Sequence, residues 1–251
     1  MGDGVSGAMF RRHTLGGVVA EGGDVTTAVI GGQNYTIHTF TGTGAFEVFR
    51  GELSVDYYIV AGGGGGGAGI NSANRGGGGG AGGRLEGSTT LSPGSYTITI
   101  GSGAGATSAG SNSSAFSIVA TGGGRGANNV TASTSGGSGG GGETSVTAGS
   151  PGIAGQGNAG GNGGGNRGGG GGGAAGAGAS GPTSGRGGDG EVSNFNGVSL
   201  VYAGGGNGSD PIAFGNKTGR ANSGDGGDGR RASAVAGVEG QDGIVMVRYL
   251  S

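Results

Sequence analysis

The sequence has no cysteine and no tryptophan, and only four of its 251 residues are proline. Without cysteine, disulfides and thiolate metal sites are excluded. Four prolines are too few for collagen, in which glycine at every third position is combined with abundant proline. No apolar run reaches the roughly 18 residues of a membrane helix, so we expect no membrane insertion. The segment Met1–Gly17 also lacks the apolar stretch of a signal peptide.

Charge is scarce and balanced, with 13 lysines and arginines against 15 aspartates and glutamates. A nucleic-acid-binding protein would show a basic stripe, so nucleic acid is not an expected partner. The two histidines, His13 and His38, belong to no distinctive serine–histidine–aspartate spacing. Gly-x-Gly-x-x-Gly matches occur by chance at this glycine density, and none lies between a strand and a helix. We therefore expect neither an enzyme nor a cofactor.

Glycine is abundant instead, at 78 of 251 residues. Such a composition often indicates disorder, because glycine loses the most backbone freedom on folding and buries no side chain. Against disorder stand short apolar runs that are rich in β-branched and aromatic residues and that pass directly into glycine. These junctions are Val55–Ala61 into Gly62–Gly67, Phe116–Thr121 into Gly122–Gly124, Val198–Ala203 into Gly204–Gly206 and, more loosely, Tyr96–Ile100 into Gly101–Gly105.

The apolar runs predict an all-β protein. No segment keeps a 3.6-residue period, so essentially no α-helix is expected. From Val25 to Ala61 the connections are too short for parallel crossovers, which predicts an antiparallel meander. The run Ser113–Thr121 predicts one strand. Ile244–Leu250 is an apolar strand suited to the middle of a sheet.

The glycine tracts always follow the C-terminal ends of strands, so they should leave an antiparallel β-sandwich, jelly-roll-like, at one end. We expect an N-terminal arm over residues 1–23 and a single domain over residues 24–251. The long glycine-rich insertions are expected at 62–83, 122–190 and 204–243. Long ordered glycine favours the threefold polyproline-II conformation. Several such helices laid side by side would form a polyglycine-II bundle.

The order of these segments resembles the glycine-rich domain proteins of bacteriophage virions. The resemblance covers residues 33–250 and is carried by Tyr35–Val48, Val55–Gly67, Ser92–Gly101, Phe116–Gly124 and Asp242–Tyr249. It implies a structural virion protein, most often in a tail fibre or another surface appendage, located on the external surface or tail. The polyglycine-II adhesins at phage fibre tips are a looser match, by glycine tracts alone.

Two groups of side chains are candidates for contacts. Interruptions of the glycine tracts could meet a host cell-surface glycan or protein, and the N-terminal arm could pack on other virion proteins. The receptor-contact candidates are Asn71, Arg75, Asn128, Asn129, Pro211, Ile212, Phe214, Asn216 and Lys217, and the anchoring candidates are Met9, Phe10, Arg11, Arg12 and Leu15.

Calcium is a weaker idea that rests on Gly187–Gly190, Gly224–Gly229 and Gln241–Gly243, which echo glycine–aspartate calcium repeats but do not repeat at nine residues. We expect turn residues there and no metal.

The expected function is thus a tail-fibre or surface adhesin component that attaches by its β-sandwich and displays a glycine-rich tip. A capsid decoration or head-fibre protein is the alternative within the same class. An ice-binding protein is the alternative from another class, because flat polyglycine-II stacks can present regular faces. A homo-oligomer is expected, with three subunits by analogy to fibres.

Overall fold

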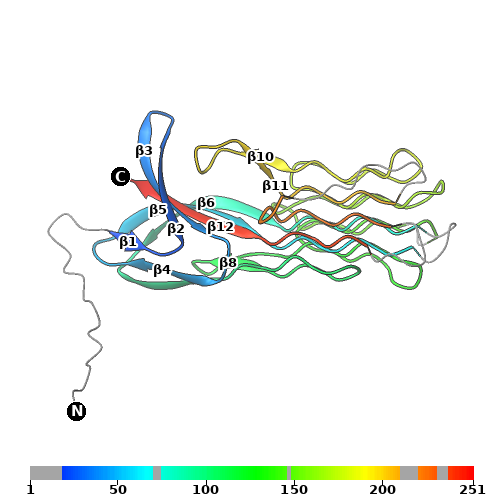
Figure 1. The fold of residues 1–251 in the computed structure, drawn as a ribbon, viewed down its shortest axis with the longest axis horizontal. Coiled ribbons are helices and arrows are strands. Elements are labelled where there is room, and N and C mark those ends of the chain that lie inside the picture. The colour runs from blue at the N-terminus through cyan, green and yellow to red at the C-terminus, as the bar shows by residue number, and fades with distance from the viewer. Residues whose placement is uncertain (1–18, 70–74, 146–147, 210–219, 231–236) are drawn as a thin grey trace, which may run out of the picture.

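A computed structural model describes residues 19–69, 75–145, 148–209, 220–230 and 237–251. It confirms the all-β prediction, because the described residues form strands, turns and extended segments and no helix. The strands lie together at one end of an elongated molecule, and extended glycine-rich segments fill the other (Figure 1). The twelve strands are β1 (Ala20–Glu21), β2 (Asp24–Ile30), β3 (Gln33–Phe40), β4 (Gly44–Val48), β5 (Leu53–Val60), β6 (Arg84–Leu91), β7 (Gly94–Ile98), β8 (Ser113–Ala115), β9 (Ile118–Ala120), β10 (Glu191–Ser193), β11 (Leu200–Tyr202) and β12 (Ile244–Leu250).

The strands pair antiparallel in a sandwich-like arrangement. One sheet has five strands in the order β2-β3-β12-β5-β6, and a second has three in the order β1-β4-β7. Two hairpins, β8-β9 and β10-β11, complete the strand region. The apolar strand β12 lies in the middle of the larger sheet, as its sequence predicts, between β3 and β5. A jelly-roll connectivity stays a prediction.

The centre of the five-stranded sheet, at β12, is buried on both faces, which explains why β12 is apolar without alternation. On β12, Val245 and Val247 belong to the core shared with the three-stranded sheet, together with Phe46 of β4. Ile244 and Met246 point to a second core on the opposite face. There they pack with Tyr58 and Val60 of β5 and with three residues around the β10-β11 hairpin, namely Phe195, Tyr202 and Ala203.

Two arginines fix the β10-β11 hairpin on the sheet. Arg84 of β6 forms an ion pair with Glu191 of β10 at 2.8 Å. Arg248 of β12 donates from Nη1 to the carbonyl of Phe195 at 3.0 Å, and its guanidinium lies 4.3 Å from the centre of the Phe195 ring. Because Arg248 also bonds Asp56 of β5 at 3.1 Å, the contact joins the hairpin to two central strands.

The predicted meander over Val25–Ala61 is wrong beyond its first hairpin. β2 and β3 pair, but β4 belongs to the other sheet, and β5 pairs with β12 and β6. The short connections predict the direction of these strands but not their pairing partners. The partner of both β3 and β5 is β12, which lies near the C-terminal end of the sequence.

The segment Ser113–Thr121 is a hairpin and not the single strand that its sequence suggests. Phe116 and Ser117 form the turn between β8 and β9 with φ of 54° and 65°. Positive φ at both turn positions suits a tight hairpin, but glycine or asparagine usually supplies it. A positive φ is rare for phenylalanine, so this turn could not be expected from the residue types.

His38 of β3 is buried between the sheets. Its Nδ1 donates to the carbonyl of Gly22 at 2.7 Å, and its ring meets Phe46 edge to face at 5.0 Å between centres. Burial lowers the pKa of His38 below its usual value of 6.5, although the bond to Gly22 opposes this. The imidazole is therefore held neutral.

His38 should make the fold sensitive to acid. Since its pKa is lower in the folded chain, the unfolded chain binds the proton first. The stabilising contribution is complete above pH 6.5 and is lost as the pH falls through the folded-state pKa. We expect Tm to fall more steeply from about pH 7.5 to about pH 5 in the native protein than in His38→Gln. Differential scanning calorimetry at both pH values measures this, and parallel slopes would contradict it.

Candidate functional site

The glycine-rich body begins directly where strands end. β5, β9 and β11 run into it at Gly62, Gly122 and Gly204, and the chain returns from it into β6, β10 and β12. All these junctions lie on one side of the strand region (Figure 1). The segment 101–111 also joins the body, although the three expected insertions do not include it.

The first glycine segment, 62–67, shows how the body is held together. Its N–H groups donate to carbonyls of three neighbouring segments in turn, and every third donor returns to the same neighbour. The six N···O distances are 2.8 to 3.0 Å. The donor–acceptor pairs are Gly62 to Ser111, Gly65 to Ser108, Gly63 to Gln241, Gly66 to Val238, Gly64 to Gly80 and Gly67 to Gly77.

The carbonyls of the same segment follow the same three-residue period toward three further neighbours. They accept from Gly123 and Gly126, from Ala104 and Thr107, and from Gly227 and Arg230. Six segments therefore surround residues 62–67, and each of these residues both donates and accepts. A period of three is the one expected for polyproline-II-like glycine helices.

The close approach of the segments requires glycine. A Cβ atom added at Gly64 would overlap the carbonyl oxygen of Gly124, and one at Gly171 would overlap that of Gly79. In contrast, a Cβ added at Gly105 would meet no heavy atom within 4 Å. Position within the body, and not membership of a glycine run, therefore decides which glycines can be replaced.

We expect Gly64→Val and Gly171→Val each to lower the free energy of unfolding by about 3 kcal/mol or more, because rigid backbone lies where the side chain must go. At this chain length that is a fall in Tm of at least about 6 °C. Gly105→Val is the matched control and should change stability by about 0.5 kcal/mol or less. Calorimetry of the three variants checks this, and equal Tm values would contradict the packing.

Side-chain oxygens replace backbone acceptors at several places in the body. Asp225 and Asp228 are buried, and their Oδ1 atoms accept from the N–H groups of Gly204 and Asn207, each at 2.7 Å. Both donors and both acceptors are three residues apart, which is the period of the body. Asp242 accepts from Gly103 in the same way at 2.7 Å. The aspartates of two of the three sequences that echo calcium repeats, Gly224–Gly229 and Gln241–Gly243, thus have a structural use as hydrogen-bond acceptors.

The turn at residues 128–131 lies at the end of the body away from the strands. Ala127, just before it, bonds Gly77 and Gly141 at the far ends of their segments. The Oδ1 atom of Asn128 accepts from the N–H of Val130 at 3.0 Å and from the N–H of Thr131 at 2.8 Å. Asn128 therefore holds the turn, while Val130 is 76% exposed at its tip.

The receptor-contact candidates fall into three groups. Asn128 and Asn129 are half-buried at this distal turn, where the side chain of Asn128 is occupied by the turn itself. Arg75 is only 6% exposed, so burial argues against a receptor contact for its side chain. The candidates that lie outside the described residues are Asn71, Pro211, Ile212, Phe214, Asn216 and Lys217, together with the anchoring candidates Met9, Phe10, Arg11, Arg12 and Leu15.

Sequence reasoning did not single out Val130 as a contact, although it lies inside a noted interruption of the tracts. Its signal is a lone apolar residue between polar turn formers. It also missed the acceptor role of Asp225 and Asp228, whose spacing of three is visible in the sequence.

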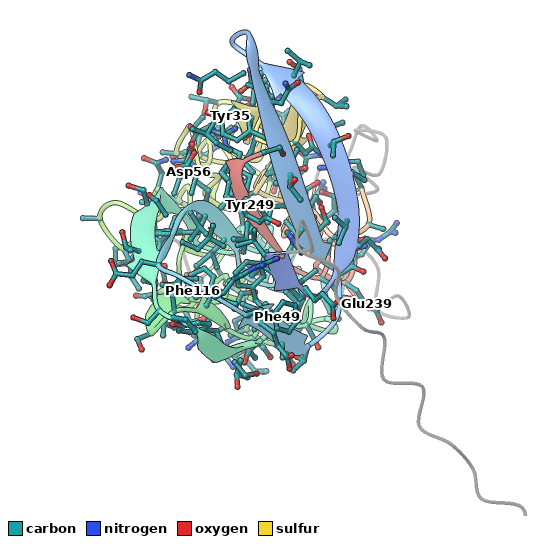
Figure 2. The ribbon with its side chains drawn as sticks, turned by 90° about the vertical axis from the view of Figure 1, so that its left-hand side faces the viewer. Tyr35, Phe49, Asp56, Phe116, Glu239 and Tyr249 are labelled. Carbon is teal, nitrogen blue, oxygen red and sulfur yellow. The ribbon has the colours of Figure 1, made fainter. Side chains whose placement is uncertain are left out.

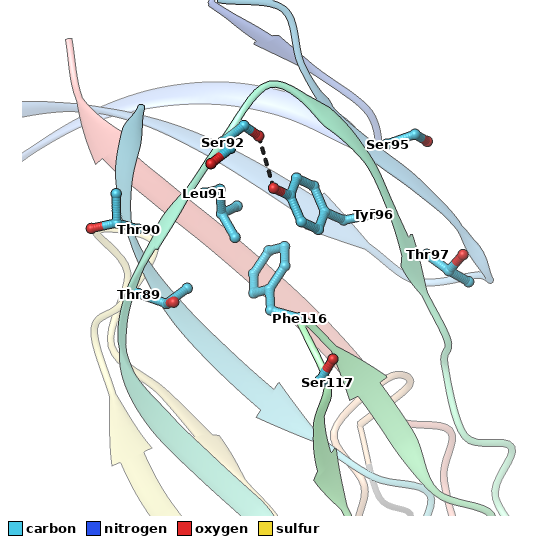
Figure 3. Close-up of a pocket in the computed structure, with 9 residues that line it drawn as sticks. All are labelled: Thr89, Thr90, Leu91, Ser92, Ser95, Tyr96, Thr97, Phe116 and Ser117. Atoms are coloured by element: carbon cyan, nitrogen blue, oxygen red, sulfur yellow. Dashed lines mark hydrogen bonds between the residues drawn. The ribbon is translucent and has the colours of Figure 1, made fainter. Parts of the chain in front are cut away.

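A groove of about 530 Å³ lies at the open edge of the sandwich, between β6 and β7 (Figure 3). The rings of Tyr96 and Phe116 meet there edge to face at 5.7 Å between centres, and the Tyr96 hydroxyl donates to the carbonyl of Ser92 at 2.7 Å. None of its lining residues is acidic or basic, so the groove offers hydroxyls and aromatic surface but no acid–base pair. The lining residues are Thr89, Thr90, Leu91, Ser92, Ser95, Tyr96, Thr97, Phe116 and Ser117.

The part of the chain that the structure describes has neither a cluster of metal ligands nor a membrane-spanning helix. No group of three or more histidine, aspartate or glutamate side chains there is placed to hold a metal ion. Nor does any helix in that part have the length and apolar character to cross a bilayer.

Fold and site define a class of protein in which antiparallel strands carry a hydrogen-bonded glycine-rich body at one end. Comparison with protein families agrees: residues 36–250 match the glycine-rich domain family. The chain belongs to this family of glycine-rich domain proteins. No curated protein matches the sequence.

Proposed function

We propose that this chain is a non-enzymatic structural protein of a bacteriophage virion. In this proposal it is a tail-fibre or surface adhesin component that attaches by its strand region and displays the glycine-rich body outward. The support is the likeness of its segment order to glycine-rich virion proteins, together with the geometry of the body. A capsid decoration or head-fibre protein is the alternative location.

The observation that carries the proposal is the difference between the interior of the glycine-rich body and its distal end. Its interior is backbone bonded to backbone, and six neighbours fix the segment 62–67. Non-glycine residues such as those of the 128–131 turn occupy the end away from the strands. A frame held mainly by backbone hydrogen bonds allows the distal residues to change without loss of the fold, which suits a surface that must recognise a varying partner.

We further propose that the segments are polyglycine-II helices and that the external surface or the tail of the particle is their location. Other virion proteins would be the partners of the strand region. A host cell-surface glycan or protein would meet the distal turns. Three subunits, expected by analogy to fibres, remain a prediction.

The virion assignment is tested on purified particles of the phage that carries the gene. Mass spectrometry should detect the chain, and antibodies against a peptide covering residues 127–132 should label the particle exterior in electron micrographs. Antibodies against β12, which is buried in the sheet, are the control and should not label intact particles. Absence of the chain from purified particles would overturn the assignment to either tail or capsid.

The adhesin part is tested by exchanging the half-buried Asn129 and the exposed Val130 of the distal turn. Asn129→Ser with Val130→Ser leaves Asn128 and Thr131 in place to hold the turn, so Tm should not change. We expect binding of the purified chain to host cells to weaken at least about fivefold, equivalent to about 1 kcal/mol. Val192→Ser, at a 65% exposed valine of β10, is the matched control. Equal binding of both variants and the native chain would argue against recognition by this turn.

A further inference from the structure

In the part of the chain that the structure describes, the outer edge of strand β2 carries backbone hydrogen-bonding groups that no other strand pairs with. β2 is the first strand of the five-stranded sheet and pairs only with β3 among the described residues. The two strands are joined by the two-residue turn Gly31-Gly32, with φ of 60° and 83°. Such a turn makes its flanking residues a hydrogen-bonded pair. The alternation of an antiparallel ladder then leaves the N–H and C=O groups of Val25, Thr27 and Val29 pointing outward.

Two of these three residues are exposed valines, so the edge is largely apolar. Val25 is 55% exposed and Val29 is 69% exposed, and both lie on one face of the strand because they are an even number of residues apart. The only charged residue of β2 is Asp24 at its start. Natural edge strands usually carry charges that prevent pairing with another chain. The opposite edge strand, β6, follows this rule with Arg84 and Glu86.

The other face of the hairpin is covered by the same chain. The loop between β10 and β11 lies there, because a Cβ atom added at Gly197 would come within 2.9 Å of the Cβ of Ala28. Figure 2 shows the β2-β3 hairpin extending past the rest of the strand region. The outward edge and the face with Val25 and Val29 are thus the parts of β2 that remain open in the described chain.

We propose that β2 is a homodimer interface, in which two copies pair antiparallel about a twofold axis at Thr27. In this register Thr27 faces its own copy, and Val25 of one chain faces Val29 of the other. The outward-pointing N–H and C=O groups of one copy then face those of the other, because the register pairs odd-numbered residues with odd-numbered residues. The two Asp24 carboxylates lie at opposite ends of the paired strands, about 20 Å apart, so they do not repel each other appreciably.

The pairing joins two five-stranded sheets into one continuous sheet. It forms two Val25–Val29 contacts on the exposed face, and apolar cross-strand pairs of this kind stabilise paired strands. A twofold contact of this type is closed, because each copy uses the same surface. It therefore gives a dimer and not the threefold fibre suggested by analogy. The inference stands independently of the virion proposal.

The mass of the full chain by sedimentation equilibrium tests the interface. We expect a reversible dimer of the native chain. Val29→Lys should raise its dissociation constant at least about tenfold, because a charge replaces both valine contacts. Val192→Lys, at the comparably exposed valine of β10, should leave the constant unchanged. A monomer or a trimer at all concentrations would overturn the proposal, as would equal constants for the two variants.

Thr27→Pro tests the backbone part of the pairing. Its N–H points outward, and proline is tolerated on an edge strand at such a position. The variant should stay folded by circular dichroism but sediment as a monomer, whereas a dimer of unchanged affinity would contradict the register.

Amide hydrogen exchange of the native chain tests the same register without a variant, so its result does not depend on whether Thr27→Pro folds. In the native chain, protection of Val25, Thr27 and Val29 should rise with protein concentration, while Thr26 and Ala28 stay protected throughout. Protection independent of concentration would overturn the proposal.

Discussion

The structure depends on one constraint, which is that a buried glycine backbone must find all its hydrogen bonds in other segments. An extended glycine segment with a three-residue period makes no hydrogen bonds within itself, and it has no side chain to bury. Ordering each residue costs about 1–2 kcal/mol. Unpaired buried N–H groups would add to that cost. The six neighbours around 62–67 meet this requirement in full, with each N–H and each C=O of the segment paired. The β-strands contribute by fixing where the segments start and in which direction they run.

The non-glycine residues of the body follow from the same constraint. Where a neighbouring carbonyl is missing, a side-chain oxygen takes its position, as at Asp225, Asp228 and Asp242. Where a segment must reverse, an asparagine such as Asn128 supplies the acceptor for the turn. Polar side chains in the body thus complete the backbone network. This explains how aspartates that resemble a calcium repeat can lie buried beside glycine.

Much of the fold was predictable because local signals were strong. The glycine junctions located β5, β9 and β11, and the apolar run of Ile244–Leu250 placed β12 in the middle of a sheet. Strand partners were not predictable, because β12 pairs with β3 and β5 across nearly the whole chain and no local signal encodes that. The Phe116–Ser117 turn was hidden because residues of these types seldom adopt positive φ. The distal turn at Asn128 could be located from the sequence, but the burial of Arg75 depends on segments distant in sequence.

The central position of β12 has a consequence for how the protein is made. A ribosome synthesises β12 after every other strand described, yet β12 fills the slot between β3 and β5. Until then both of those strands have an open side, and the segments 238–241 and 227–230 that surround 62–67 have only just been made. Folding therefore cannot proceed from the N-terminus in step with translation, as it does in many multidomain chains. The native sheet can close only after β12 is made, when the first and last parts of the domain meet, and contacts of such long range make folding slow.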